Sequence, residues 1–201
     1  MKKIKGLIAI AACTTLIACS SSGGGDSTSN NADLQGTWLD SDCAYDAEQD
    51  ISVSFSLTIN GNAFTLSRII DELTNDCSGT ALTFVNQLGT FVVQNEVTTL
   101  PGGDAKHIDI TYTKGSFTAN QEYKDLLTAQ GTTLEDLYAA VGVDDVNNAT
   151  LAQVGIEAAM DYDIYRVDGR ILRLGDSDTG DGSTPAARPT ALDLSTTLLK
   201  Q

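Results

Sequence analysis

The sequence lacks the local motifs of the commonest enzyme classes. It has no Gly-x-Ser-x-Gly nucleophile elbow, no phosphate-binding loop and no dinucleotide-binding motif. Its 12 lysines and arginines are outnumbered by 27 aspartates and glutamates, which gives a formal net charge of −15. Such an acidic chain disfavours nucleic acid and anionic lipid as partners. We therefore expect no enzymatic activity, and a hydrolase that uses a pair of carboxylates is the enzymatic alternative.

The N-terminus lacks an apolar run long enough to span a membrane. The run at residues 7–18 is shorter than the roughly 20 residues that a membrane-spanning helix needs. It follows Lys2, Lys3 and Lys5, and a basic start before a short apolar run is typical of a secretory signal. We therefore predict a signal peptide at residues 1–18.

The end of this run resembles the lipobox of bacterial lipoproteins. Leu16-Ile17-Ala18-Cys19 has the small and aliphatic residues that precede the modified cysteine in that family. The resemblance implies that Cys19 carries lipid, palmitate included, and becomes the first residue; an unmodified cysteine in an ordinary signal peptide is the alternative. Ser20 stands where a retention signal would place Asp. The resemblance thus implies the outer membrane, with the protein facing the periplasm or the cell surface.

Residues 19–33 are rich in serine, glycine and asparagine and contain almost no large apolar side chain. Such a composition is typical of a flexible linker, here between the lipidated cysteine and a folded domain at residues 34–201. The chain from residue 34 is long enough to form one domain with its own hydrophobic core.

The few remaining cysteines favour a disulfide. The four cysteines include no Cys-x-x-Cys redox motif, and Cys13 lies within the signal peptide. A zinc site would have to combine Cys43 and Cys77 with the single histidine, His107, without any closely spaced pair of ligands. We therefore predict a Cys43–Cys77 disulfide, which suits an oxidising compartment.

The clearest local pattern is a β-hairpin. Residues 51–59 alternate apolar and small polar side chains, which predicts a half-buried strand, and a second strand is expected at residues 62–70. Asn60-Gly61 is a preferred pair for the two-residue loop between them. This loop places Leu57 opposite Phe64, Phe55 opposite Leu66 and Val53 opposite Arg68. It makes Arg68 the one charge on the apolar face.

The rest of the chain predicts more short strands and a helical insert. Strands are expected at residues 80–86, 90–98, 107–113, 116–119, 161–167 and 170–175, with turns near Gly89, Lys114-Gly115 and Asp168-Gly169. His107 falls on the polar face of its strand, which predicts an exposed side chain.

Residues 120–160 change to helical spacing, which predicts a helical insert. This segment has a Thr132–Glu135 capping box, an apolar stripe of Leu134, Leu137, Tyr138 and Val141, and a third helix at about 149–160. The tail from Ser177 is expected to be irregular with one short strand. The fold class is therefore mainly β, a small antiparallel barrel with an α-helical insert, and a β-sandwich is the alternative.

Several stretches resemble lipocalin-like domains. Gly36-Thr37-Trp38 matches the Gly-x-Trp that opens the first strand in that superfamily. The later stretches HIDITYTKG, YRVDGRILRLGD and ARPTALD follow an order found in small bacterial lipocalin-like proteins. The resemblance implies a lipocalin-like barrel and a structural role for Trp38 at its closed end. The helical insert departs from the short connection expected there.

Two functions follow from this reading. In the first, the barrel binds a small apolar or amphipathic ligand, and the predicted contacts are Arg68, Phe55, Leu57, Phe64, Leu66 and Tyr112. With Arg68 as the only inward charge, this pocket suits a polar or anionic head group. In the second, the barrel is filled by its own side chains and its surface binds an envelope protein. No cofactor is expected; a calcium site at Asp176, Asp178 and Asp181 is an alternative, although these residues do not follow the EF-hand spacing.

Overall fold

The computed structural model describes residues 31–201. The predicted signal peptide, Cys19 and most of the linker at residues 19–33 lie outside this range. The strands are β1 (Gly36–Asp40), β2 (Ala44–Asp46), β3 (Ile51–Asn60), β4 (Ala63–Asp71), β5 (Leu82–Leu100), β6 (Gly103–Ala119), β7 (Met160–Asp168), β8 (Ile171–Leu174) and β9 (Leu198–Lys200). The helices are α1 (Gln121–Ala129) and α2 (Leu134–Ala139), with 3₁₀ turns η1 (Ala152–Val154) and η2 (Pro185–Ala187).

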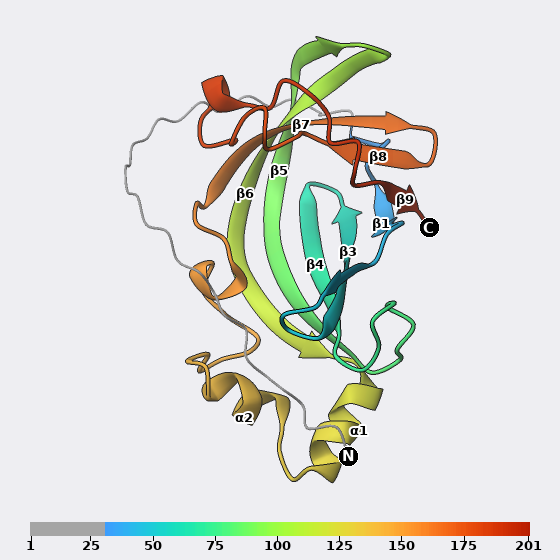
Figure 1. Cartoon of the computed structure of the whole chain (residues 1–201). Coiled ribbons are helices and arrows are strands. Elements are labelled where there is room, and N and C mark those ends of the chain that lie inside the picture. The colour runs from blue at the N-terminus through green and yellow to red at the C-terminus, as the bar shows by residue number, and fades with distance from the viewer. Residues whose placement is uncertain (1–30) are drawn as a thin grey trace.

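The strands form a closed antiparallel barrel (Figure 1). The sheet runs in the order β1-β9-β8-β7-β6-β5-β4-β3-β2, and β1 also pairs with β3. This last pairing closes a ring of eight strands and leaves the short β2 outside it, on β3. The predicted barrel is therefore confirmed, and the alternative of a β-sandwich is wrong.

The β3–β4 hairpin is confirmed, but its predicted register is wrong by two residues. Asn60 pairs with Ala63, so the loop is Gly61-Asn62 rather than Asn60-Gly61. Leu57 therefore lies opposite Leu66, and Phe55 lies opposite Arg68. Because a shift of two residues preserves the alternation of faces, the predicted inward face is retained.

Strands β5 and β6 are long and continuous, so the turns predicted near Gly89 and at Lys114-Gly115 are wrong. A Cβ atom at Gly89 would lie 2.2 Å from the carbonyl oxygen of Thr111, at a bulge between β5 and β6. A Cβ atom at Gly115 would lie 2.2 Å from Cγ1 of Val154. Both glycines therefore allow another segment to pack closely against a strand. They serve this close contact and not a turn.

The helical insert has two helices instead of three. Asn120 caps α1 by accepting from the backbone N–H of Tyr123, and α2 has a capping box of Thr133 and Asp136. The capping box is therefore one residue later than predicted. The third helix, predicted at residues 149–160, is reduced to η1, because Ala149 bridges to Gly115 and Met160 already begins β7.

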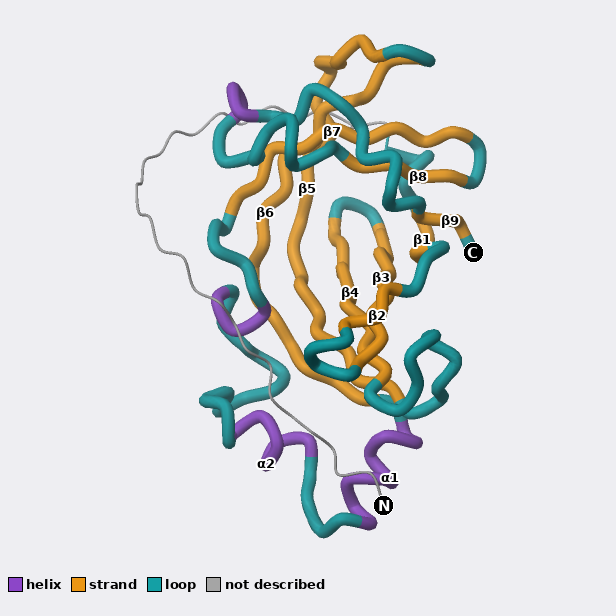
Figure 2. The backbone as a smooth tube through the Cα atoms, in the orientation of Figure 1, coloured by secondary structure: helices purple, strands orange, loops and turns teal. Residues whose placement is uncertain are grey.

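The insert packs into one end of the barrel, opposite the β7–β8 hairpin (Figures 1 and 2). The rings of Tyr138 and Phe117 stack with centroids 4.2 Å apart. Of the predicted apolar stripe, Leu134 and Tyr138 are buried and Leu137 is half-buried, but Val141 is exposed. A single buried cluster joins the insert to the strands: Ile51, Val53, Ile70, Ala81, Val85, Phe117, Ala119, Tyr123, Leu127, Leu134, Tyr138, Val143, Val146, Ala149 and Val154. The insert is therefore part of the hydrophobic core of the domain.

A second buried cluster, around Trp38, fills the part of the barrel interior next to β1. Trp38 on β1 is fully buried and donates from Nε1 to the carbonyl oxygen of Leu34 at 2.7 Å. The Nζ atom of Lys200 lies 5.0 Å from the centroid of the Trp38 ring. Trp38 thus belongs to the core, and Lys200 is the cation above its ring.

The loops outside the barrel are held by a disulfide and a buried carboxylate. Cys43 and Cys77 are bonded, which confirms the predicted disulfide. Asp71 accepts from the backbone N–H groups of Leu73, Thr74 and Gly79, so it orders the loop that carries Cys77. The segment between β8 and β9 is irregular apart from η2, as expected. Within residues 31–201, no helix is both long and apolar enough to cross a bilayer.

Candidate ligand cavity in the barrel

Two cavities adjoin each other inside the barrel. The larger has a volume of about 340 Å³ and the smaller about 220 Å³. Phe55 of β3 and Leu66 of β4 line both. Phe55 is 37% exposed although its inward neighbours Val53 and Leu57 are buried. The inner face of the β3–β4 hairpin is therefore open to a space that the protein's own side chains do not fill.

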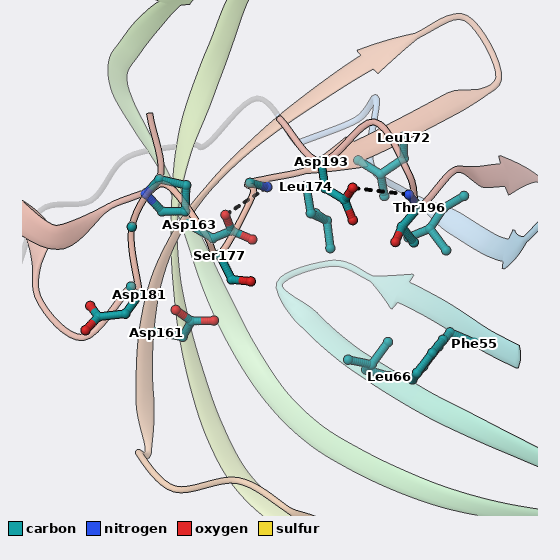
Figure 3. A pocket seen from close by; sticks show the side chains of 15 residues that line it. Phe55, Leu66, Asp161, Asp163, Leu172, Leu174, Ser177, Asp181, Asp193 and Thr196 are labelled. Atoms are coloured by element: carbon teal, nitrogen blue, oxygen red, sulfur yellow. Dashed lines mark hydrogen bonds between the residues drawn. The ribbon is translucent and has the colours of Figure 1, made fainter. Parts of the chain in front are cut away.

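The larger cavity lies between this hairpin, the β7–β8 hairpin and the irregular segment before β9. Figure 3 shows Asp161 and Asp163 of β7 across the cavity from Phe55 and Leu66. The other lining residues are Leu172, Leu174, Gly175, Ser177, Gly180, Asp181, Gly182, Pro189, Asp193, Thr196 and Leu198. The cavity thus combines apolar walls with several carboxylates.

The sheet register explains why the two carboxylates of β7 face inward. Asp163 lies opposite Ile108, and Asp161 lies opposite Ile110. Directly opposed residues of an antiparallel pair share a face, and Ile108 belongs to the buried cluster around Trp38. Asp161 and Asp163 therefore occupy the inner face of the barrel, where a strand would ordinarily place apolar side chains.

Burial sets the protonation of this pair. The Oδ1 atom of Asp163 accepts from the backbone N–H of Ile164 at 2.7 Å and of Gly175 at 3.0 Å. Burial, together with the charge of Asp161, nevertheless raises the pKa of Asp163 to about 7 against these hydrogen bonds. Burial also raises the pKa of Asp161. In the same region, burial and these two carboxylates raise the pKa of Tyr112.

Arg188 lies close to this pair but is bonded elsewhere. The residue is 9% exposed, and its Nη1 donates to the carbonyl oxygens of Ile108, at 2.8 Å, and Asp163, at 2.6 Å. Its Nη2 donates to Oδ1 of Asp109 at 2.6 Å. Asp109 lies on the face of β6 opposite to Ile108, so Arg188 holds the C-terminal segment to the outside of the barrel. Its charge lowers the pKa of Asp163 only as a minor contribution.

The smaller cavity contains the inward cation. Arg68 lines it together with Val85, Phe117 and residues 153–155 at the end of η1. Gln87, which also lines it, donates to the carbonyl oxygen of Val154 at 3.0 Å. Among residues 31–201, Arg68 forms no ion pair. The two cavities therefore differ in charge, with a cation in the smaller and carboxylates in the larger.

The structure brings together only part of the predicted ligand site. Phe55, Leu66 and Arg68 line the cavities. Leu57 and Phe64 are buried in the core, and Tyr112 packs edge-on against Phe64 with the ring centroids 5.5 Å apart. These three residues line neither cavity, because the core around Trp38 fills that part of the barrel.

Two other sequence-based expectations, an exposed His107 and a calcium site, are wrong. His107 is half-buried rather than exposed, because its Nε2 lies 2.9 Å from Oγ1 of Thr98. The candidate calcium ligands Asp176, Asp178 and Asp181 do not converge, since no group of three or more His, Cys, Asp or Glu side chains in residues 31–201 could hold a metal ion. Asp176 instead accepts from the backbone N–H of Asp178 at 3.0 Å, as in an ordinary turn.

The fold and the cavities define a class of protein: a closed eight-stranded antiparallel barrel whose interior is filled only in part. No protein-family model matches the chain, and no curated protein matches it. The class therefore rests on the barrel topology and on the cavities.

Proposed function

We propose that this protein is a lipid-anchored, lipocalin-like protein of the bacterial outer membrane that binds a small apolar or amphipathic ligand inside its barrel. One observation carries the binding proposal: Phe55 and Leu66 are open to two adjoining cavities in the interior of a closed barrel. Uncovered aromatic and aliphatic side chains favour a partner that removes them from water.

The size of the cavities supports a small ligand. Pockets for small molecules commonly have volumes of about 300–1,000 Å³, and the larger cavity has about 340 Å³. A barrel that served only as a scaffold for an envelope partner would gain stability by filling this space with larger side chains. The cavities therefore favour the binding function over the alternative of a filled barrel.

The location is supported by the sequence and by the disulfide. The lipobox-like segment ends at Cys19, and Ser20 follows it. The Cys43–Cys77 bond suits an oxidising compartment. A domain tethered in this way would meet its ligand in the periplasm or at the cell surface.

Calorimetric titration of octyl compounds tests the binding proposal. The protein is the full chain with Cys19→Ala, purified under non-reducing conditions, and the probes are 1-octanol, octanoate and octylammonium. We expect saturable binding of at least one probe. In the Leu66→Trp variant the indole would occupy space shared by the two cavities, so the affinity should fall by at least about tenfold.

The matched control is Val97→Trp, which adds the same indole at a 48% exposed position of β5 outside both cavities. This variant should bind like the parent. Absence of saturable binding for all three probes, or equal affinities in the two tryptophan variants, would contradict the proposal. Circular dichroism of each variant checks that the barrel is folded.

A further inference from the structure

The larger cavity has a charge that selects among amphipathic ligands. Its lining contains four aspartates and, within the described part of the chain, no lysine, arginine or histidine. Asp181 and Asp193 are occupied by neighbouring groups: Asp181 accepts from Ser183, and Asp193 from Ser195. Asp161 and Asp163 differ, because no side chain of residues 31–201 donates a hydrogen bond to either and neither forms an ion pair.

Asp161 and Asp163 are half-buried, and carboxylates that are partly removed from water favour a nearby cation. Removing a carboxylate from water is costly unless a cation or several hydrogen bonds replace the solvent. The nearest guanidinium, that of Arg188, is directed to backbone carbonyls and to Asp109 on the outer side of the sheet. The pair on β7 thus leaves acceptor capacity open toward a cavity whose opposite wall is apolar.

From this geometry we propose that the ligand of the larger cavity is a cationic amphiphile, an amine whose ammonium group pairs with Asp161 and Asp163 while its apolar body contacts Phe55 and Leu66. This inference rests on the proposed binding function and adds the sign of the head group. It reverses the sequence-based expectation of a polar or anionic head, because Arg68 lines the other cavity.

The three octyl probes test the inference, since they share one apolar body and differ only in the charge of the head. The measurement is made at pH 8, above the pKa of Asp163 of about 7, where this carboxylate is mainly charged. We expect octylammonium to bind about tenfold more tightly than 1-octanol, as is typical of a charge-assisted hydrogen bond. Octanoate should bind more weakly than 1-octanol.

The double variant Asp161→Asn/Asp163→Asn should abolish the preference for octylammonium over 1-octanol. The asparagine oxygen can still accept from Ile164 and Gly175, so the backbone contacts of the wall are retained. The control variant Asp104→Asn/Asp178→Asn removes the same charge at exposed positions outside the cavity and should keep the preference.

Each outcome separates the two proposals. Binding of 1-octanol without any preference for octylammonium would overturn the inference and leave the binding function intact. A preference that persists in Asp161→Asn/Asp163→Asn, or that disappears equally in the control variant, would also overturn it. If no probe binds saturably, the binding function itself fails, and the inference fails with it.

Discussion

Gly115 is the position where the helical insert contacts the backbone of β6, and an alanine there should force the two apart. A Cβ atom would lie 2.2 Å from Cγ1, 2.6 Å from Cγ2 and 2.9 Å from Cβ of Val154. Val154 is 5% exposed within the core cluster, and the N–H of Gly115 donates to the carbonyl oxygen of Ala149 at 2.9 Å. Neither segment can therefore shift without loss of packing or of this hydrogen bond.

The structure gives the size of the effect and a way to reverse it. Overpacking of this kind should lower the free energy of unfolding of Gly115→Ala by about 2 kcal/mol. The single variant Val154→Ala should also lose ~2 kcal/mol of unfolding free energy, because it leaves a cavity in the core. In the double variant both Cγ contacts are absent and only the 2.9 Å contact remains. Its total loss should therefore stay near 2 kcal/mol instead of reaching the additive value of about 4 kcal/mol.

Equilibrium unfolding in urea under non-reducing conditions measures these values. The control pairs Val154→Ala with Gly180→Ala, whose Cβ would meet the carbonyl oxygens of Ala187 and Arg188 but not Val154. The losses of that pair should add. Additivity of Gly115→Ala and Val154→Ala within about 0.5 kcal/mol would refute the direct packing of the insert on β6.

Other predictions follow from the disulfide, the carboxylate of Asp163 and the lipid anchor. Replacing Cys43 and Cys77 with serine should lower the free energy of unfolding by roughly 3–4 kcal/mol, measured in urea, and unchanged stability would contradict the role of the bond. Burial raises the pKa of Asp163 in the folded protein from 3.8 to about 7, so the folded state binds more protons in this range and stability should fall as the pH rises from about 4 to 7. Asp163→Asn should flatten this part of the stability profile, and an unaltered slope would show that other groups cause it. Cys19→Ala should abolish metabolic labelling with palmitate, and a labelled variant would contradict lipidation at this residue.

Local sequence patterns predicted the fold where the contacts are also local. The alternation of residues 51–59 and the Asp168-Gly169 pair correctly indicated hairpins, because period and turn chemistry act within a few residues. Asp168 pairs with Ile171, however, so the second loop is Gly169-Arg170 and begins one residue later than predicted. Gly89 and Gly115 misled the prediction for a long-range reason. Each accommodates a segment from elsewhere in the chain, and a single sequence does not reveal such an approach.

The candidate site was predictable in part for a similar reason. Phe55 and Leu66 follow from the phase of the hairpin, which survives a register error of two residues. Asp161, Asp163 and Tyr165 are spaced two residues apart in β7, so the sequence alone indicates that they share one face of the strand. Acidic side chains are normally solvated, however, and only the closure of the barrel places this face inside. The core position of Leu57 and Phe64 likewise depends on packing around Trp38.

The most direct test of the central claim is native mass spectrometry of the protein purified gently from its own cells. The claim is that the barrel interior holds a small molecule next to Phe55 and Leu66. It predicts a non-covalent adduct on the parent protein and on Val97→Trp, and none on Leu66→Trp, in which the shared space is filled. An adduct that persists unchanged in Leu66→Trp, or a parent protein that carries none and binds no octyl probe, would contradict the claim.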